Sequence, residues 1–162
     1  MESILICTAN AELLPERKTH GAVCRDLKIT QEISILPWKI QTVSTWIKIR
    51  LPEWWHAKVY ARSGLPVKWW IMLANSVAIF DTDYRGEYIL QLYNTTDKTV
   101  TFEKFSRLAQ LEFCPTYYPN VTYTTQIHTP ELESIVDTSM FASFEKKFPT
   151  ERWTWKFNST WL

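Results

Sequence analysis

Short runs in which apolar and polar residues alternate account for most of the pattern in the first 115 residues of the chain. Four such runs are clear, at 47–51, 56–61, 99–103 and 108–113. A period of two places successive side chains on opposite faces of a strand, so each run predicts a strand with one buried face. Many short strands separated by turn residues predict an all-β sandwich or jelly roll.

Three later or non-alternating segments differ from this pattern. The stretch 67–74 follows Pro66, a residue suited to a helix start, and predicts one short helix. Two prolines and a run of Thr and Tyr at 115–125 indicate the end of the regular core. The sequence then predicts a helical turn or two at 130–144 and an irregular tail. We therefore expect a β domain at 1–130 and a C-terminal extension at 131–162.

Composition and charge narrow the class of protein. A chain of 162 residues is long enough to bury the core of one ordinary domain. A net charge of +1 indicates no nucleic-acid or anionic-membrane partner. Because the start has no basic region and no segment approaches a membrane span in length, we predict a cytoplasmic protein. The scattered cysteines Cys7, Cys24 and Cys114 favour reduced thiols over disulfides or a zinc site.

Three polar clusters could carry chemistry. The cluster at 62–64, Arg-Ser-Gly, offers a guanidinium, a hydroxyl and a bare amide, which suit an oxyanion, although an ordinary polar turn looks the same. The cluster at 81–87 contains Asp and Gly, which are also favoured in hairpin turns for their geometry. The run at 107–110 could be a strand with a polar outer face. Each cluster alone therefore leaves both interpretations open.

The order and spacing of these clusters resemble the five motifs of the dUTPase family over nearly the whole sequence. The matching segments are Asp26-Leu27, Ala61-Arg62-Ser63-Gly64-Leu65, Asn75 with Asp81-Thr82-Asp83-Tyr84-Arg85-Gly86-Glu87, Arg107-Leu108-Ala109-Gln110-Leu111, and Arg152-x-x-x-x-Phe157-x-Ser159-Thr160. The third and fourth are close to verbatim, whereas the first and fifth depart from the family pattern. The resemblance implies a jelly-roll β-barrel with one short helix, assembled as a homotrimer with an extended C-terminal arm.

The resemblance also implies hydrolysis of dUTP to dUMP and pyrophosphate with Mg²⁺. Asp81 would be the general base that activates a water for attack on the α-phosphorus. Tyr84 would pack under the deoxyribose, where a 2′-hydroxyl could not fit. Asn75 and the backbone of Ile79 and Phe80 would pair with the uracil edge.

The remaining motif positions are implied to hold the triphosphate, the metal and the closing arm. The expected phosphate ligands are Arg62, Ser63, Gly64 and Gln110. The expected arm residues are Arg152 on the γ-phosphate, Phe157 stacked on uracil, and Ser159 and Thr160. Mg²⁺ would be held mainly by phosphates and water, with Asp26 assisting through water. In family members three subunits share each active site.

Two other functions stay open at this point. A dCTP deaminase belongs to the same fold family but lacks the Asp-x-Asp-Tyr-Arg-Gly-Glu hairpin, so the sequence speaks against it. A dUTPase-fold interaction protein with weak or no catalysis is favoured by the altered first and fifth motifs. The intact Asp81, Arg62, Ser63 and Gln110 oppose it.

Glycine is scarce and tryptophan abundant, with 3 and 9 residues respectively. Seven tryptophans stand where the family expects glycine: Trp38, Trp46, Trp54, Trp70, Trp153, Trp155 and Trp161. Tryptophan is a poor substitute where φ must be positive or a backbone must approach closely. We hypothesise that the gene uses UGA for glycine and was decoded as if UGA meant tryptophan. The alternative is a divergent, tryptophan-rich protein whose bulky arm closes poorly.

Overall fold

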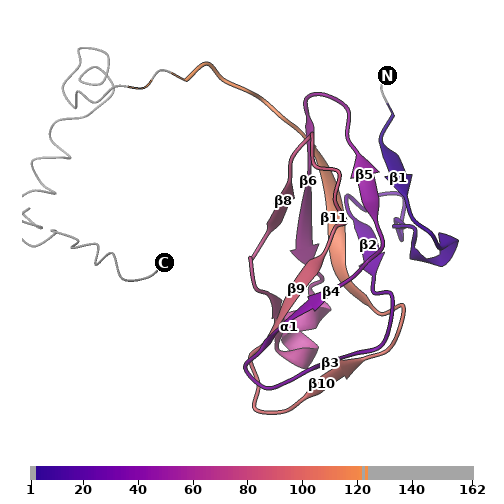
Figure 1. The fold of residues 1–162 in the computed structure, drawn as a ribbon, viewed down its shortest axis with the longest axis vertical. Coiled ribbons are helices and arrows are strands. Elements are labelled where there is room, and N and C mark those ends of the chain that lie inside the picture. Colours follow the sequence, from indigo (N-terminus) through magenta and orange to yellow (C-terminus); the bar gives the residue numbers. More distant parts are fainter. Residues whose placement is uncertain (1–2, 122, 124–162) are drawn as a thin grey trace, which may run out of the picture. The chain divides into compact units, whose positions relative to one another are not determined.

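The computed structural model describes residues 3–121 and 123, and Figure 1 shows short strands with one small helix. In chain order the elements are β1 (Leu5–Cys7), the 3-10 helix η1 (Ala11–Leu13), β2 (Arg25–Lys28), β3 (Ile33–Ile35), β4 (Ile40–Val43), β5 (Lys48–Arg50), β6 (Trp55–Ala61), α1 (Gly64–Trp69), β7 (Ile71–Leu73), β8 (Ala78–Phe80), β9 (Leu90–Asn94), β10 (Val100–Phe102) and β11 (Arg107–Pro115). The all-β prediction with one short helix is confirmed.

The largest sheet has the strand order β2-β11-β6-β8, and all of its pairs are antiparallel. A second sheet has the order β4-β9-β7, and two strand pairs, β1-β5 and β10-β3, complete the set. Strand β11 runs between β2 and β6, as Figure 1 shows. Its residue Gln110 lies opposite Asp26 on β2 and Tyr60 on β6. This register brings three motifs that are distant in sequence to one place.

The four alternating runs form strands β5, β6, β10 and β11, as predicted. Their apolar positions supply much of the core, because alternation points one face of each strand inward. Ile49 on β5, Val59 on β6 and Leu111 on β11 are all buried. One detail differs: Leu108, which alternation places on the polar side, is buried together with Ala109. A register shift between Arg107 and Ala109 in the pairing with β2 accompanies this change of phase.

The predicted helix at 67–74 is wrong in its bounds. Helix α1 begins earlier, at Gly64, and ends at Trp69. Trp70 then adopts a left-handed conformation, and its N–H donates to the Pro66 carbonyl, which closes the last turn. The next three residues form β7, which pairs with β9 and follows the alternating burial of a strand. A helical C-cap thus separates two elements that the sequence pattern had joined.

The compact β unit ends at Tyr118. In the described part of the chain, no regular element follows Pro115, which agrees with the predicted end of the core. The predicted boundary at 130, the helical turns at 130–144 and the arm lie outside the described residues. Among the residues that are described, no helix is long and apolar enough to cross a membrane.

Candidate active site

A pocket of about 370 Å³, here called the charged pocket, lies where β2, β6 and β11 meet. Its lining residues are Lys18, Ala22, Val23, Cys24, Asp26, Arg62, Ser63 and Gln110. Strand register explains the assembly, because Asp26 and Gln110 are paired positions and Arg62 directly follows β6. Four of the predicted site residues, Asp26, Arg62, Ser63 and Gln110, therefore come together here.

Asp26 organises the charged pocket through two ion pairs. Its Oδ1 lies 3.1 Å from Arg62 Nε, and its Oδ2 lies 3.2 Å from Arg107 Nη1. Arg62 Nη1 also donates to the Arg107 carbonyl at 3.2 Å, and Gln110 Nε2 donates to the Ala61 carbonyl at 3.1 Å. Asp26 is only 9% exposed. Two guanidinium groups against one carboxylate leave positive charge beside the pocket, which suits a polyanionic ligand.

The turn from β6 into α1 presents the Arg-Ser-Gly cluster to this pocket. Ser63 precedes the helix, yet its side chain makes no capping hydrogen bond, so its hydroxyl is not committed to the helix. The turn is held instead by the backbone, where the Leu65 N–H donates to the Arg62 carbonyl at 2.9 Å. A Cβ added at Gly64 would meet nothing within 4 Å. Space beside the Gly64 backbone is therefore open to a ligand.

A second pocket, of about 460 Å³ and here called the hairpin pocket, forms around β8 and the turn that follows it. Its lining residues are Thr42, Asn75, Val77, Ala78, Ile79, Phe80, Tyr84, Glu87, Ile89 and Gln91. The predicted uracil and sugar contacts, Asn75, Ile79, Phe80 and Tyr84, all line it. Asp81 directly follows Phe80 in an exposed turn, where its carbonyl accepts from the Tyr84 N–H at 3.1 Å.

Contacts between aromatic rings support the hairpin pocket. The rings of Phe80 and Tyr88 are stacked, with centroids 3.8 Å apart and an interplanar angle of 7°. The Tyr84 ring is tilted against Phe80 at 5.4 Å, and its hydroxyl donates to the Glu87 carbonyl at 3.0 Å. A Cβ at Gly86 would lie 2.6 Å from Tyr84 Cζ, closer than real contacts allow. Glycine at this position is what lets the Tyr84 ring fold over its own turn.

The carboxylate of Glu87 ties the hairpin to a distant turn. Glu87 Oε1 accepts from the Ser44 hydroxyl and from the backbone N–H groups of Thr45 (2.9 Å) and Trp46 (2.8 Å). Burial alone would raise the pKa of Glu87, but these hydrogen bonds favour the charged form, so its pKa lies below the ordinary value. Successive backbone N–H groups that converge on one carboxylate form an anion-binding nest. The hairpin is thus anchored by a charge.

Comparison with known proteins identifies the family. The sequence profile of the dUTPase family matches residues 10–140.

The chain belongs to the dUTPase family.

Relatives and solved structures of this family agree in sequence and fold. The chain is 39% identical over 104 residues to the deoxyuridine 5'-triphosphate nucleotidohydrolase of Chlamydia felis, covering 63% of this chain and 71% of that protein. A relative of the same name from Rickettsia prowazekii is 42% identical over 100 residues, covering 60% and 68%. The dUTPase of Streptococcus mutans superposes with a TM-score of 0.69 at 29% identity, over 74% of this chain and all of that one.

A dUTPase of Staphylococcus bacteriophage 80alpha superposes with a TM-score of 0.70, over 80% of this chain and 100% of that one. At 15% identity this likeness concerns the fold alone. The predicted dUTPase-like jelly roll is confirmed by these structures.

The predicted site residues of this family member fall into two sets that share no lining residue. One set lines the charged pocket and the other lines the hairpin pocket. Gly64 lies beside the first set, and Asp81 lies beside the second. The arm positions Arg152, Phe157, Ser159 and Thr160 lie outside the described residues, so their role stays a prediction.

Three residues in or beside these pockets had no role in the sequence prediction. Arg107 belongs to the fourth motif, but its pairing with Asp26 depends on strand register. Glu87 closes the third motif, and its partners precede it by more than forty positions. Lys18 lies in the loop between η1 and β2 without any recognisable motif. The first two carried a signal as motif members, whereas Lys18 carried none.

The donor groups fit a metal that the ligand itself holds. In the described residues, no group of three or more His, Cys, Asp or Glu side chains could bind a metal ion. Asp26 is the one carboxylate that lines the charged pocket, and both of its oxygens are ion-paired. Mg²⁺ keeps several waters and is often bound through one carboxylate plus substrate phosphates. Among the described residues, Asp26 therefore fits an indirect role, through water.

Proposed function

We propose that this chain is a dUTP diphosphatase that hydrolyses dUTP to dUMP and pyrophosphate. The names of its relatives, deoxyuridine 5'-triphosphate nucleotidohydrolase, support dUTP as the substrate. The observation that carries the proposal is the hairpin pocket, which Asn75, Phe80 and Tyr84 line, with Asp81 directly following Phe80 in the chain. A cationic pocket on the same chain supports it, since a nucleoside triphosphate needs both a base site and a phosphate site.

Asp81 acts as the general base of this reaction. Its exposed side chain holds a water and accepts the proton as the water oxygen attacks the α-phosphorus. The bond from that phosphorus to the bridging oxygen of the β-phosphate breaks, and pyrophosphate leaves. A carboxylate suits this step because it needs only to orient and polarise the water.

The hairpin pocket selects the nucleoside. Asn75 and the backbone of Ile79 and Phe80 pair with the uracil edge, and the Tyr84 ring lies under the deoxyribose. A site built to hydrogen-bond one base rejects another by about 10⁴-fold, because its own polar groups are left unpaired. The Tyr84 ring takes a position that the missing Cβ of Gly86 permits, and the hydrogen bond from its hydroxyl to the Glu87 carbonyl holds it there, so a 2′-hydroxyl would clash with the ring.

The charged pocket holds the phosphates through Arg62, Ser63, the Gly64 backbone and Gln110. Asp26 keeps the Arg62 guanidinium in place by its 3.1 Å ion pair. Asp26 would contact the water shell of a Mg²⁺ ion held by the triphosphate, and such an ion would neutralise charge on the leaving pyrophosphate. The protein's own part is to orient the chain of phosphates.

We further propose a cytoplasmic homotrimer in which one site draws on three subunits. The absence of any shared lining residue between the two pockets supports this arrangement, since a dUTP molecule would then bridge a hairpin pocket and a partner's charged pocket. The arm residues Arg152, Phe157, Ser159 and Thr160 would close over the nucleotide from a third subunit.

Pyrophosphate release with Mg²⁺ tests the activity, on the chain as printed and on a version with glycine at the seven tryptophan positions named above. We expect the glycine version to turn over dUTP in strong preference to UTP, dTTP and dCTP. Ammonia release from dCTP would instead show a deaminase. A folded glycine version without any turnover would leave the fold as an interaction module.

Subunit mixing tests the shared site. Asp81→Asn chains and Arg62→Ala chains, each inactive alone, are unfolded, mixed and refolded together. If the hairpin and phosphate groups of one site come from different subunits, random mixing restores roughly a quarter of the normal activity. In that fraction of sites, an unaltered Asp81 from one subunit meets an unaltered Arg62 from another. The matched control is a chain that carries both Asp81→Asn and Arg62→Ala, mixed and refolded with unaltered chains. No recovery in the first mixture would mean that each site lies within one chain.

A further inference from the structure

The six tryptophans in the described residues fall into two backbone classes. Four have a positive φ: Trp38 (57°), Trp46 (55°), Trp54 (67°) and Trp70 (54°). The other two, Trp55 in β6 and Trp69 in α1, do not. A positive φ is uncommon for any residue other than glycine and is a genuine outlier for a bulky one. The division coincides with the family comparison, which expects glycine at the first four positions and not at the other two.

The glycines of the chain show the opposite preference. None of the described glycines has a positive φ. Apart from the four tryptophans, only Ser76 and Phe105 among the described non-glycine residues have one. Left-handed positions in the described part of the chain are therefore filled mostly by tryptophan, the reverse of what side-chain sterics favour.

Local structure explains why three of these positions must be left-handed. Trp70 is the C-cap of α1 with φ 54° and ψ 33°, the conformation that glycine supplies at helix ends. Trp38 follows Pro37 in a turn closed by the Lys39 N–H on the Leu36 carbonyl, at the third turn position, where glycine follows proline in type II turns.

Trp46 lies in the nest whose N–H groups hold Glu87, so its φ aims the donor at the carboxylate. At these three places the turn or the hydrogen bond requires the φ, and the indole contributes nothing to it.

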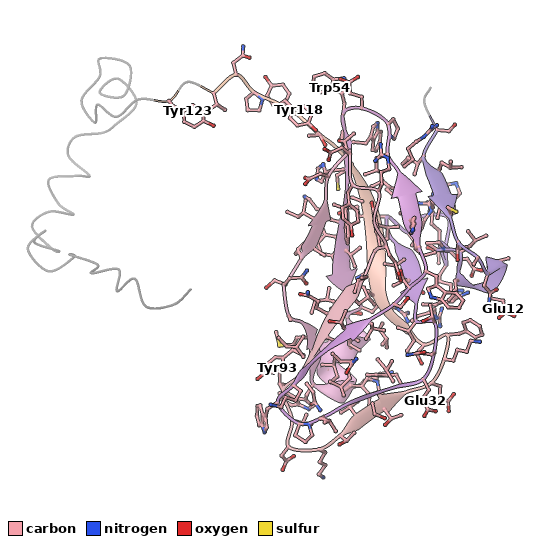
Figure 2. All side chains as sticks on the ribbon, viewed as in Figure 1. Glu12, Glu32, Trp54, Tyr93, Tyr118 and Tyr123 are labelled. Carbon is pink, nitrogen blue, oxygen red and sulfur yellow. The ribbon has the colours of Figure 1, made fainter. Side chains whose placement is uncertain are left out.

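The four side chains do little that would offset the strain. Trp38, Trp46, Trp54 and Trp70 are all between 50% and 66% exposed. Trp54 alone of these has a recorded aromatic partner, Tyr118 at 5.3 Å, and Figure 2 shows the pair at one end of the strands. In contrast, Trp55 packs partly buried against the core, and Trp69, although 47% exposed, meets the buried Phe102 edge-on at 5.4 Å. The two tryptophans with ordinary φ are thus the two whose rings contact the core.

We infer that positions 38, 46, 54 and 70 are glycine in the protein that the source cell makes, and that Trp55 and Trp69 are true tryptophans. One codon explains the whole pattern. UGA differs by a single base from UGG, which encodes tryptophan, and by a single base from the glycine codon GGA. A cell that decodes UGA as glycine yields this printed sequence when its gene is translated with UGA as tryptophan. The inference rests on backbone geometry and is independent of the proposed activity.

The gene sequence provides the first test. We expect UGA at codons 38, 46, 54 and 70, and UGG at codons 55 and 69. The motif comparison alone extends the expectation of UGA to codons 153, 155 and 161. UGG at any of the first four codons, or UGA at codon 55 or 69, overturns the inference. Peptide mass spectrometry of the protein from its own cells must then show glycine masses at the four positions.

Thermal unfolding of two full-length recombinant proteins provides a physical test. One carries tryptophan at the four positions as printed, and the other carries Trp38→Gly, Trp46→Gly, Trp54→Gly and Trp70→Gly. We expect the glycine version to unfold about 10 °C higher, because four left-handed strains are removed. The inference is supported equally if the tryptophan protein shows no cooperative unfolding transition and the glycine protein does. An equal or lower transition in the glycine version overturns the inference.

Matched controls come from the two remaining tryptophans. Trp55→Gly and Trp69→Gly, each made in the glycine version, remove a packed indole and place glycine in a strand or a helix. Both changes are expected to lower the unfolding temperature. If they raise it as the other four do, the gain reflects removal of exposed apolar surface and the geometric inference fails.

Discussion

The two pockets of this chain are built in opposite ways. The charged pocket draws its groups from β2 with the 18–24 segment before it, from β11 and from the turn after β6. These parts are distant in sequence and meet through strand register and two ion pairs on Asp26. The hairpin pocket draws most of its groups from 75–91, one continuous segment whose shape depends on a turn and on stacked rings. One is assembled by the sheet, and the other by local chemistry.

This difference predicts how each pocket responds to change. Groups in the charged pocket hold one another, so a substitution there should disturb stability together with phosphate binding. Groups at the tip of the hairpin are exposed, so a substitution there should alter catalysis and leave stability alone. The anchor of the hairpin, Glu87, is an exception that links both behaviours. The variants below test the comparison, from the largest expected effect to the smallest.

Asp81→Asn should have the largest effect, and on activity alone. The variant keeps the shape of the side chain but cannot accept the proton of the attacking water, so kcat should fall by about 10²- to 10⁴-fold. The unfolding temperature should not change, because Asp81 is exposed. Asp83→Asn, in the same exposed turn, is the matched control and should retain normal turnover. Full activity in Asp81→Asn would exclude Asp81 as the general base. It would also contradict the expectation that substitutions at the exposed tip of the hairpin alter catalysis.

Asp26→Asn should affect stability and phosphate binding together. The amide leaves two guanidinium groups without a counter-charge, at an expected cost of about 1–3 kcal/mol in the free energy of unfolding. Urea denaturation measures this loss, which should shrink at high salt, where the exposed parts of both arginines are screened. KM for dUTP should rise as Arg62 loses its 3.1 Å partner.

Glu16→Gln is a control of like charge for this change. Glu16 pairs with Lys18 at 3.0 Å, but its side chain is 52% exposed. Its removal should therefore change stability little. Equal losses in the Asp26 and Glu16 variants would show that net charge matters, and that the geometry of the charged pocket does not.

Sequence patterning was sufficient for much of the fold. Alternation found strands β5, β6, β10 and β11 because each buries one face, and a period of two is visible without any tertiary context. It failed at 67–74, where a helix, a left-handed cap at Trp70 and strand β7 follow one another within a few residues. Glycine at a left-handed cap is the usual sequence signal for a helix end, and tryptophan at position 70 gives no such signal. The predicted helix therefore continued past the cap.

The candidate site divides along the same line. Motifs located Arg62, Asn75 and Tyr84 because those residues sit in short contiguous patterns. The partners of Asp26 and Glu87 were beyond the reach of sequence, since each pairing joins residues that only strand register or a remote turn brings together. Local patterns thus specified which side chains act, and tertiary pairing specified what holds them.

Glu87→Gln should have a moderate effect that depends on pH. The amide can still accept hydrogen bonds from Ser44 and the 44–46 turn but without charge, so we expect a loss of about 1 kcal/mol near neutral pH. Because the folded pKa of Glu87 lies below its ordinary value of 4.5, its contribution is present above that pH. It is lost as the pH falls through the lowered folded pKa.

Stability curves of the two proteins against pH should therefore converge on the acid side of about 4.5, since the glutamine variant has no carboxylate to protonate. A constant gap across the whole range would mean that the nest binds the side chain by shape alone. In that case the hydrogen bonds of Glu87 act without a contribution from charge, as the other contacts of the hairpin pocket do. They would then differ from the ion pairs of the charged pocket.

Tyr88→Phe should have the smallest effect, and in the stabilising direction. Tyr88 is fully buried, and its hydroxyl has no hydrogen-bond partner in the described residues, so burial raises its pKa far above the ordinary value. Removing an unpaired hydroxyl while keeping the stack on Phe80 should raise the free energy of unfolding by up to about 1 kcal/mol, with KM for dUTP unchanged. Tyr88→Leu, which removes the stack, should lower stability and weaken selection for uracil, because Phe80 then loses its support. If Tyr88→Phe proves destabilising, a water or a neighbouring subunit must satisfy the hydroxyl, and the hairpin pocket is held by more than its local rings.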